Sequence, residues 1–174
     1  MERICIIGCS GTGKTTLADN LGKELNLPVY HIDGINYLSN WEKRDKKERD
    51  RIIIEKTSLD KWVIDGNYNA TLYERLKKSD FVIFLDYSTI SHVLGVLKRY
   101  IKLKGKERKE IPGCKEKLDK KFLLYVLNFK RKKRIKIIEL LNKVDSNKVH
   151  IFKSRRKLNK WYKNKFNKEI IIDI

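Results

Sequence analysis

The most constraining feature of this 174-residue chain is residues 8–15, GCSGTGKT, which fit the phosphate-binding pattern G-x-x-x-x-G-K-[ST]. A short apolar run at residues 3–7 precedes the pattern, as is typical of a buried parallel strand. Apolar residues then recur at helical spacing as far as Leu25. A strand, a glycine-rich loop and a helix are the three parts that such a site needs. We therefore expect a phosphate-binding loop and not a chance match of the string.

The chemistry expected of this loop follows from its residue types. Glycines let the backbone turn tightly and approach a ligand, and the free N–H groups at the start of the next helix attract anions. Lys14 is expected to reach the β- and γ-phosphates of a nucleotide, and the Thr15 hydroxyl is expected to ligate Mg²⁺. The residues assigned to nucleotide binding in the loop are Gly8, Cys9, Ser10, Gly11, Thr12, Gly13, Lys14, Thr15 and Thr16.

The chain is strongly basic. Lysine and arginine total 41 against 22 aspartates and glutamates, which gives a formal net charge of +19, and the basic residues crowd positions 98–168. Such a charge favours anionic partners such as nucleotides or nucleic acid. A lysine-rich surface that is only solvated explains the charge equally well, so weak nucleic-acid binding stays open at this point.

Cysteine usage and hydropathy give the expected environment. Cys5, Cys9 and Cys114 form no zinc-binding spacing and fit reduced thiols in the cytosol. Lys and Glu interrupt any early apolar run, and no run reaches the ~18 apolar residues of a membrane helix. We therefore expect a cytoplasmic protein with no membrane partner, either a monomer or a weak dimer.

Five short apolar runs, at residues 3–7, 29–32, 62–64, 81–85 and 149–152, alternate with helical patterns. This order predicts an α/β fold of three layers, a P-loop NTPase sandwich with a five-stranded, mostly parallel sheet. Residues 169–172 are a candidate for an added edge strand. The expected helices span residues 14–25, 43–58, 72–76, 90–101, 119–144 and 155–166.

Two of the expected segments have a special character. In the helix over residues 90–101, one apolar stripe is expected, with Arg99 roughly opposite it, two residues from Leu97. The members of the stripe are Ile90, Val93, Leu94, Leu97 and Ile101. Residues 102–121 contain two glycines, a proline and many charges but almost no apolar side chains. This composition predicts a mobile lid.

Three of the strands lead into an aspartate, namely Asp33, Asp65 and Asp86. In open parallel sheets ligands bind beyond the carboxyl ends of the strands, so these carboxylates are expected near the phosphate-binding loop. Asp65 precedes a sharp turn at residues 66–68 and is favoured over Asp86 for Mg²⁺. Asp33 is favoured for orienting or deprotonating an acceptor hydroxyl. Each aspartate has the alternative of capping the helix that follows it.

Phosphoryl transfer also needs positive charge over the transferred group, for which the forked donors of arginine are well suited. The candidates are Arg99, Arg108, Arg131 and Arg134, and Arg155 with Arg156 is a candidate pair for stacking on a nucleobase. His31, His92 and His150 are expected to have structural roles. The residues assigned to catalysis are Lys14, Asp33, Asp65, Arg99 and Arg131, and those assigned to the metal are Thr15 and Asp65.

The chain also resembles a known family. The matching blocks are residues 8–16, His31-Ile32-Asp33, residues 62–68 (WVIDGNY), Gly113-Cys114 and Ser154-Arg155-Arg156. In this order they are similar to the bacterial DNA topology modulation proteins, a branch of the adenylate-kinase-related P-loop kinases. The resemblance extends to about Tyr162, and the WVIDGNY block is its specific part.

This resemblance implies a nucleoside-monophosphate-kinase-like fold with ATP and Mg²⁺ as ligands. It implies one domain over residues 1–174, with a core (1–33, 60–100 and 145–174), an acceptor-side insert (about 34–59) and the lid (about 102–121). Asp65-Gly66 is similar to the Asp-Gly of adenylate kinases that serves Mg²⁺ and the phosphates. Asp33 is similar in place to the acceptor-site aspartate of shikimate- and gluconate-type kinases. Asn67-Tyr68 replaces the Phe-Pro-Arg of adenylate kinases, which favours a neutral hydroxyl acceptor over a nucleoside monophosphate.

The sequence thus predicts a kinase that moves the ATP γ-phosphate to a small acceptor, namely a nucleoside, a nucleotide or a similar hydroxyl compound. A nucleic-acid-binding protein that modulates DNA topology, with ATP as a switch, remains the alternative. A 5′-polynucleotide kinase would unite the two readings. The number and spread of basic residues fit either function, so composition does not decide between them.

Overall fold

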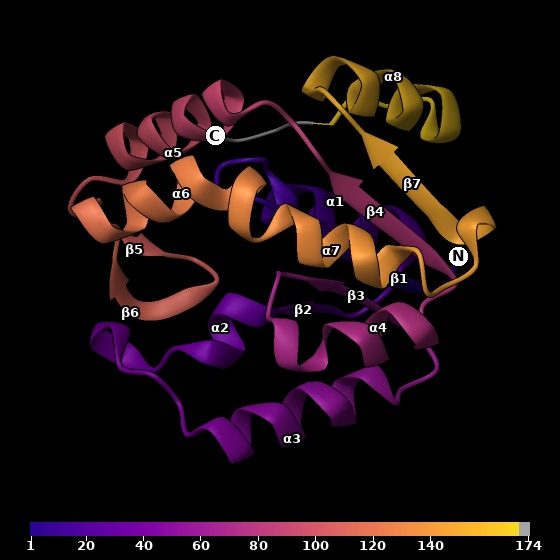
Figure 1. The fold of residues 1–174 in the computed structure, drawn as a ribbon, viewed down its shortest axis with the longest axis horizontal. Helices are drawn as coiled ribbons and strands as arrows, with labels where there is room; N and C mark the ends of the chain where they lie inside the picture. Colours follow the sequence, from indigo (N-terminus) through magenta and orange to yellow (C-terminus); the bar gives the residue numbers. More distant parts are fainter. Residues whose placement is uncertain (171–174) are drawn as a thin grey trace.

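In the computed structural model, which describes residues 1–170, a five-stranded parallel sheet lies between helices (Figure 1). The strand order is β2-β3-β1-β4-β7, and each neighbouring pair is parallel, which confirms the α/β expectation. All five strands occur where the apolar runs predict them. They are β1 (Arg3–Gly8), β2 (Val29–His31), β3 (Trp62–Asp65), β4 (Phe81–Leu85) and β7 (Val149–Phe152).

Both faces of the sheet are buried, because alternate residues of each strand belong to two different apolar cores. Ile4 and Ile6 of β1 pack into the core with α1 and α8, whereas Cys5 and Ile7 pack into the core with α3 to α7. Figure 1 shows α6 and α7 in front of the sheet and α1 behind it. The helices are α1 (Lys14–Leu25), α2 (Ile32–Asn36), α3 (Lys46–Thr57), α4 (Leu72–Lys78), α5 (Thr89–Leu103), α6 (Lys120–Lys132), α7 (Arg134–Leu141) and α8 (Arg155–Phe166).

Local sequence explains where several helices begin. Asp45, Ser88, Asp119 and Ser154 stand just before α3, α5, α6 and α8, and each side chain accepts a hydrogen bond from a backbone N–H of the first turn. Such caps satisfy donors that would otherwise have no partner. Within residues 1–170, no helix combines the length and the apolar character needed to cross a bilayer.

The single helix expected over residues 119–144 is wrong, because the structure has two helices, α6 and α7, separated at Lys133. Phe129 of α6 and Ile137 of α7 are both buried in the same core. In an unbroken helix these positions would be rotated by about 80° from each other. The break at Lys133 lets both side chains reach the sheet.

The segment after β2 also differs from expectation. The strand expected over residues 29–32 ends at His31, and Asp33 lies in the first turn of the short helix α2. The lid region contains a β-hairpin of β5 (Glu107–Arg108) and β6 (Ile111–Lys115), and it has two buried apolar anchors, Ile111 and Cys114. Of the expected edge strand over residues 169–172, Glu169 and Ile170 belong to no strand, and residues 171–172 lie outside the described residues.

Helix α5 turns its apolar stripe outward. Ile90 and Ile101 are 73% and 75% exposed, whereas His92, Gly95 and Val96 are buried. The reason is the close approach of the phosphate-binding loop: a Cβ on Gly95 would lie 2.0 Å from the Gly11 carbonyl oxygen. Only a glycine at this helical position lets α5 support the loop from behind.

Candidate active site

The phosphate-binding loop lies between the end of β1 and the start of α1. Gly11 and Gly13 have φ values of 79° and 88°, in the left-handed region that favours glycine, so the loop backbone can coil over the helix N-terminus. Lys14 folds back, and its Nζ donates a hydrogen bond of 3.0 Å to the Cys9 carbonyl oxygen. Burial lowers the pKa of Lys14, and the charges of Asp65 and Asp33 partly oppose that effect. The ammonium group therefore lies near two carboxylates at the mouth of the loop.

Asp65, at the end of β3, is the carboxylate closest to the loop hydroxyl. The Thr15 hydroxyl donates to Asp65 Oδ2 at 3.3 Å, and the carboxylate is 4% exposed. The other oxygen, Oδ1, is 2.6 Å from Nδ1 of His31, whose Nε2 lies 3.1 Å from Asp19. Burial acts to lower the pKa of His31, but the hydrogen bond that His31 donates to Asp65 and the charges of Asp65 and Asp19 outweigh it, so the pKa is raised. The sequence predicted Asp65 here but missed His31 as part of the site.

Thr15 and Asp65 fit a magnesium ion. Both supply hard oxygen donors, and their 3.3 Å separation places them within reach of one cation. In residues 1–170 there is no group of three or more His, Cys, Asp or Glu side chains suited to a metal ion. Proteins usually bind magnesium through one or two side chains together with substrate phosphates and water.

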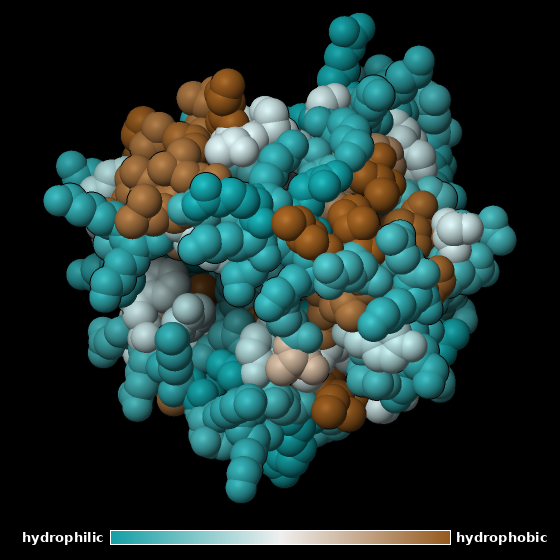
Figure 2. Space-filling view, viewed as in Figure 1, coloured by the Kyte–Doolittle hydropathy of each residue, from teal (hydrophilic) through white to brown (hydrophobic). Residues whose placement is uncertain are grey.

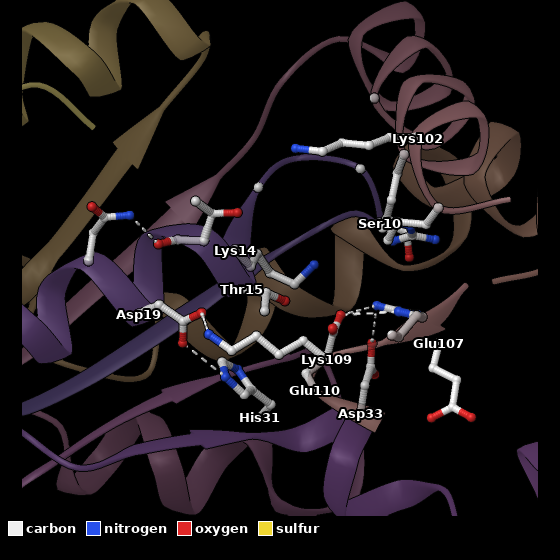
Figure 3. A pocket seen from close by; sticks show the side chains of 18 of the residues that line it. Ser10, Lys14, Thr15, Asp19, His31, Asp33, Lys102, Glu107, Lys109 and Glu110 are labelled. Atoms are coloured by element: carbon white, nitrogen blue, oxygen red, sulfur yellow. Dashed lines mark hydrogen bonds and ion pairs between the residues drawn. The ribbon is translucent and has the colours of Figure 1, made fainter. Parts of the chain in front are cut away.

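Two cavities meet at the loop. The larger, of about 760 Å³, extends from the loop and α1 to His31, Arg99 and the lid. In Figure 3, Asp33 and Glu110 lie together, below Lys14 and Thr15. The smaller, of about 330 Å³, extends from the loop to Asn36, the turn after β3 and Tyr125. Three residues line both cavities: Ser10, Lys14 and Asp33.

Two arginines line the larger cavity, one from α5 and one from the hairpin of β5 and β6. Arg99 of α5 donates to Glu116 at 3.0 Å, and Arg108 of β5 donates to Glu110. Arg108 also lies 3.9 Å from Asp33, whose side chain is 52% exposed. This cluster of alternating charges joins the lid to the helix that follows β2. Both were among the four arginines that the sequence analysis named as candidates for the positive charge over the transferred group, and both line this cavity.

Other expected residues lie elsewhere. The negative charge of Asp86 is balanced by two cations. Arg134 donates to both of its oxygens at 2.8 and 2.9 Å, and Lys153 donates to one of them. Burial acts to raise the pKa of Asp86, but these hydrogen bonds hold it below its ordinary value. Arg131 is exposed and donates to Asn128, while Arg155 and Arg156 begin α8. None of these residues lines either of the two cavities.

Asn67 holds the loop in register, a role that the sequence did not reveal. Its Oδ1 accepts from the Gly8 N–H at 2.9 Å, and its Nδ2 donates to the Gly8 carbonyl oxygen. The side chain thus pairs with the Gly8 peptide as a neighbouring strand would. The buried Arg75 of α4 in turn donates to the carbonyl oxygens of Gly66 and Tyr68, both at 2.8 Å, and fixes the turn that carries Asn67.

The hairpin of β5 and β6 is joined to the segment between α2 and α3 by Trp41, which lies at the end of a 3₁₀ turn (Ser39–Trp41). Its backbone N–H donates to Cys114 Sγ at 3.2 Å, and its indole N–H donates to the Lys115 carbonyl oxygen at 2.8 Å. Cys114 Sγ also donates to the Leu38 carbonyl oxygen at 3.1 Å. These hydrogen bonds hold β6 against residues 38–41, and residues 107–110 of the same hairpin line the larger cavity.

We expect Mg²⁺ and a non-hydrolysable ATP analogue to slow amide exchange in β5 and β6 at least about tenfold, because a ligand in the cavity stabilises the closed hairpin. Hydrogen exchange with mass spectrometry measures this effect. The buried strand β4 serves as the internal control and should exchange slowly in both states. Unchanged protection of the hairpin at saturating analogue would contradict the prediction of a lid.

Comparison with known proteins supports the fold. Residues 4–86 match the family model described as ATPase family associated with various cellular activities (AAA). No curated protein sequence matches the chain. The shikimate kinase of Acinetobacter baumannii, solved in complex with shikimate, aligns with a TM-score of 0.58 and 18% identity over 96% of this chain and 94% of the enzyme.

A gluconokinase from Sinorhizobium meliloti 1021 aligns with a TM-score of 0.52 and 13% identity, over 95% of this chain and 90% of that one. At these identities the likeness is one of fold. The resemblance to DNA topology modulation proteins stays a prediction. The chain has the α/β fold of P-loop kinases, with its loop and the hairpin of β5 and β6 around one cavity, and with Asp65 hydrogen-bonded to Thr15 at the end of that loop.

Proposed function

We propose that this protein is a kinase that transfers the γ-phosphoryl group of ATP to a hydroxyl group of a small acceptor. The observation that carries the proposal is that Lys14 and Asp33 line both cavities. A donor bound on the loop and an acceptor bound beside the turn after β3 would meet between these two side chains. Phosphoryl transfer requires that donor and acceptor are bound next to each other, beside a cation that stabilises the phosphate and a carboxylate that orients the acceptor.

The residues divide into donor and acceptor roles. Backbone N–H groups of the loop and Lys14 bind the phosphates, and Thr15 and Asp65 hold Mg²⁺, which neutralises charge on phosphate oxygens when bound. Arg99 and Arg108 face the larger cavity from the lid side and balance the charge on the transferred group. Asp33, the more exposed carboxylate, orients or deprotonates the acceptor hydroxyl. Arg131, Arg155 and Arg156 stay predictions, the first for catalysis and the other two for the nucleobase.

The smaller cavity favours an acceptor of low charge. Its lining contains three asparagines and two tyrosines, with Lys133 as the cation beyond Lys14 and Asp33 as the carboxylate, and it contains no arginine. Amide and phenol groups recognise hydroxyl and ring nitrogen atoms, whereas arginine forks are the usual partners of a phosphate group. We therefore place nucleosides and hydroxy acids, the latter paired with Lys133, ahead of nucleoside monophosphates.

The test is a transfer screen with labelled ATP against nucleosides, nucleotides, shikimate, gluconate and oligonucleotide 5′ ends. Lys14→Ala should weaken binding of the ATP analogue about 10- to 100-fold without unfolding the protein, because a loop lysine supports no core. Lys47→Ala, at an exposed position of α3, is the matched control and should bind normally. Calorimetry measures both affinities.

Equal binding by wild type and Lys14→Ala would overturn the donor assignment. Transfer only to oligonucleotide ends would favour the polynucleotide kinase over the small-molecule kinase. Transfer to no compound in the screen, with normal ATP binding, would favour the role of ATP as a switch.

A further inference from the structure

The exposed apolar stripe of α5 continues onto α6. Ile90, Leu94 and Ile101 of α5 are 73%, 52% and 75% exposed, and Leu124 and Leu127 of α6 are 57% and 47% exposed. Figure 2 shows apolar side chains gathered over these two helices, at the upper left of the view. Together they expose on the order of 500 Å² of apolar surface, a size that often marks an interaction site on a monomer.

The charged residues within the two helices that form this patch have one sign, although the exposed Asp119 caps the start of α6. Neither α5 nor α6 contains an aspartate or a glutamate. Lys98 follows Leu94 at helical spacing on α5, and on α6 Lys120, Lys121 and Arg131 stand three or four residues from Leu124 and Leu127. Lysine and arginine at such positions can lie along an apolar surface while their charged ends reach outward. The patch is therefore an apolar centre with a cationic rim.

We propose that the face formed by α5 and α6 docks on a membrane surface that contains anionic lipids. An apolar helical face with lysines beside it is the pattern of helices that lie in the headgroup region. Anionic headgroups complement the cationic rim, whereas a second copy of this chain would bring rim against rim and repel. The proposal is independent of the kinase assignment, and it departs from the expectation of no membrane partner. It concerns peripheral docking and not a membrane-crossing segment.

The shape of the patch favours lipid over a protein partner. Ile90 and Ile101 expose about three quarters of their surface, so they project from the helix and do not line a groove. A protein partner would need matching holes for each of these projecting side chains. A bilayer adapts to them, because isoleucine and leucine side chains insert between headgroups without a fixed partner geometry.

The experiment is co-sedimentation with vesicles of phosphatidylcholine alone and with vesicles that also contain phosphatidylglycerol. Wild type should bind the second kind and not the first. The double variant Ile90→Gln with Ile101→Gln should bind at least about tenfold more weakly, because two inserted side chains are lost. This variant keeps the net charge of +19, so it separates insertion from simple attraction between charges.

Ile54→Gln, which changes a 47% exposed isoleucine on α3, is the control and should bind the vesicles as wild type does. Normal binding of the ATP analogue shows that each variant is folded. Equal vesicle binding by the double variant and wild type would overturn the proposal, and so would no binding to anionic vesicles. A dimer that the double variant abolishes, measured by light scattering without lipid, would assign the face to a second copy instead.

Discussion

Replacing Asp33 with Asn is expected to slow phosphoryl transfer about 10²- to 10⁴-fold while Mg·ATP binding stays nearly unchanged, which is the loss typical of a missing general base. Asp33 lines both cavities, is half exposed and lies 3.9 Å from Arg108. It touches neither Thr15 nor the loop backbone through any hydrogen bond, so its loss leaves the phosphate site in place.

Asp65→Asn is expected to have the complementary effect and to weaken Mg²⁺-dependent ATP use with every acceptor. The carboxylate is buried and accepts from Thr15, and an amide at this position lacks the charge that a divalent cation needs. Asn would also lose the ionic contact with His31. Calorimetry at fixed Mg²⁺ gives the affinity, and initial rates with saturating ATP give the transfer step.

Asp60→Asn, at an exposed position before β3, is the matched control for both variants. If Asp33→Asn abolishes Mg·ATP binding and Asp65→Asn spares it, the two roles are reversed. If both variants transfer at the wild-type rate, neither carboxylate acts as we propose.

The second large effect concerns Arg75. Arg75→Met should lower the free energy of unfolding by about 2–4 kcal/mol, because the buried carbonyl oxygen of Gly66 and the partly buried one of Tyr68 each lose a donor. Removing the cation also removes the free-energy cost of burying its charge. Burial lowers the pKa of Arg75, because it disfavours the charged form. We expect the two unpaired carbonyl groups to outweigh that relief, because methionine fills similar space but donates no hydrogen bond.

Denaturant unfolding of Arg75→Met measures this difference, with Arg51→Met on the exposed side of α3 as the control. The turn after β3 carries Asn67, so binding of the ATP analogue should weaken as well. Arg75→Lys should restore little, because one ammonium group does not reproduce the two-pronged guanidinium. If the variant is as stable as wild type, the free energy gained by no longer burying the charge equals the free energy lost with the two hydrogen bonds, and the prediction is wrong.

The sequence by itself determined the features that depend only on residues close together in the chain: the loop, the strands and the start of a helix. The glycine spacing at residues 8–15 requires a phosphate-binding loop, and five apolar runs of strand length require a buried parallel sheet. Because parallel strands end at one edge, Asp33 and Asp65 had to come near the loop. The start of α6 follows from its cap at Asp119.

Tertiary structure decided which of these side chains are free to act. Asp33, Asp65 and Asp86 all follow strands, and the sequence favoured Asp65 over Asp86 only by the turn after it. The structure adds that Asp86 pairs with Arg134 and Lys153, which lie 48 and 67 residues further along the chain. Asn67 reaches Gly8 across 59 residues, a pairing that no spacing rule encodes.

The outward face of α5 was decided in the same way. Its periodicity defines an apolar stripe, but the approach of Gly11 to Gly95 turns the opposite side toward the core. A repeat in sequence fixes which residues share a face of a helix, and only the packing of distant segments fixes where that face points.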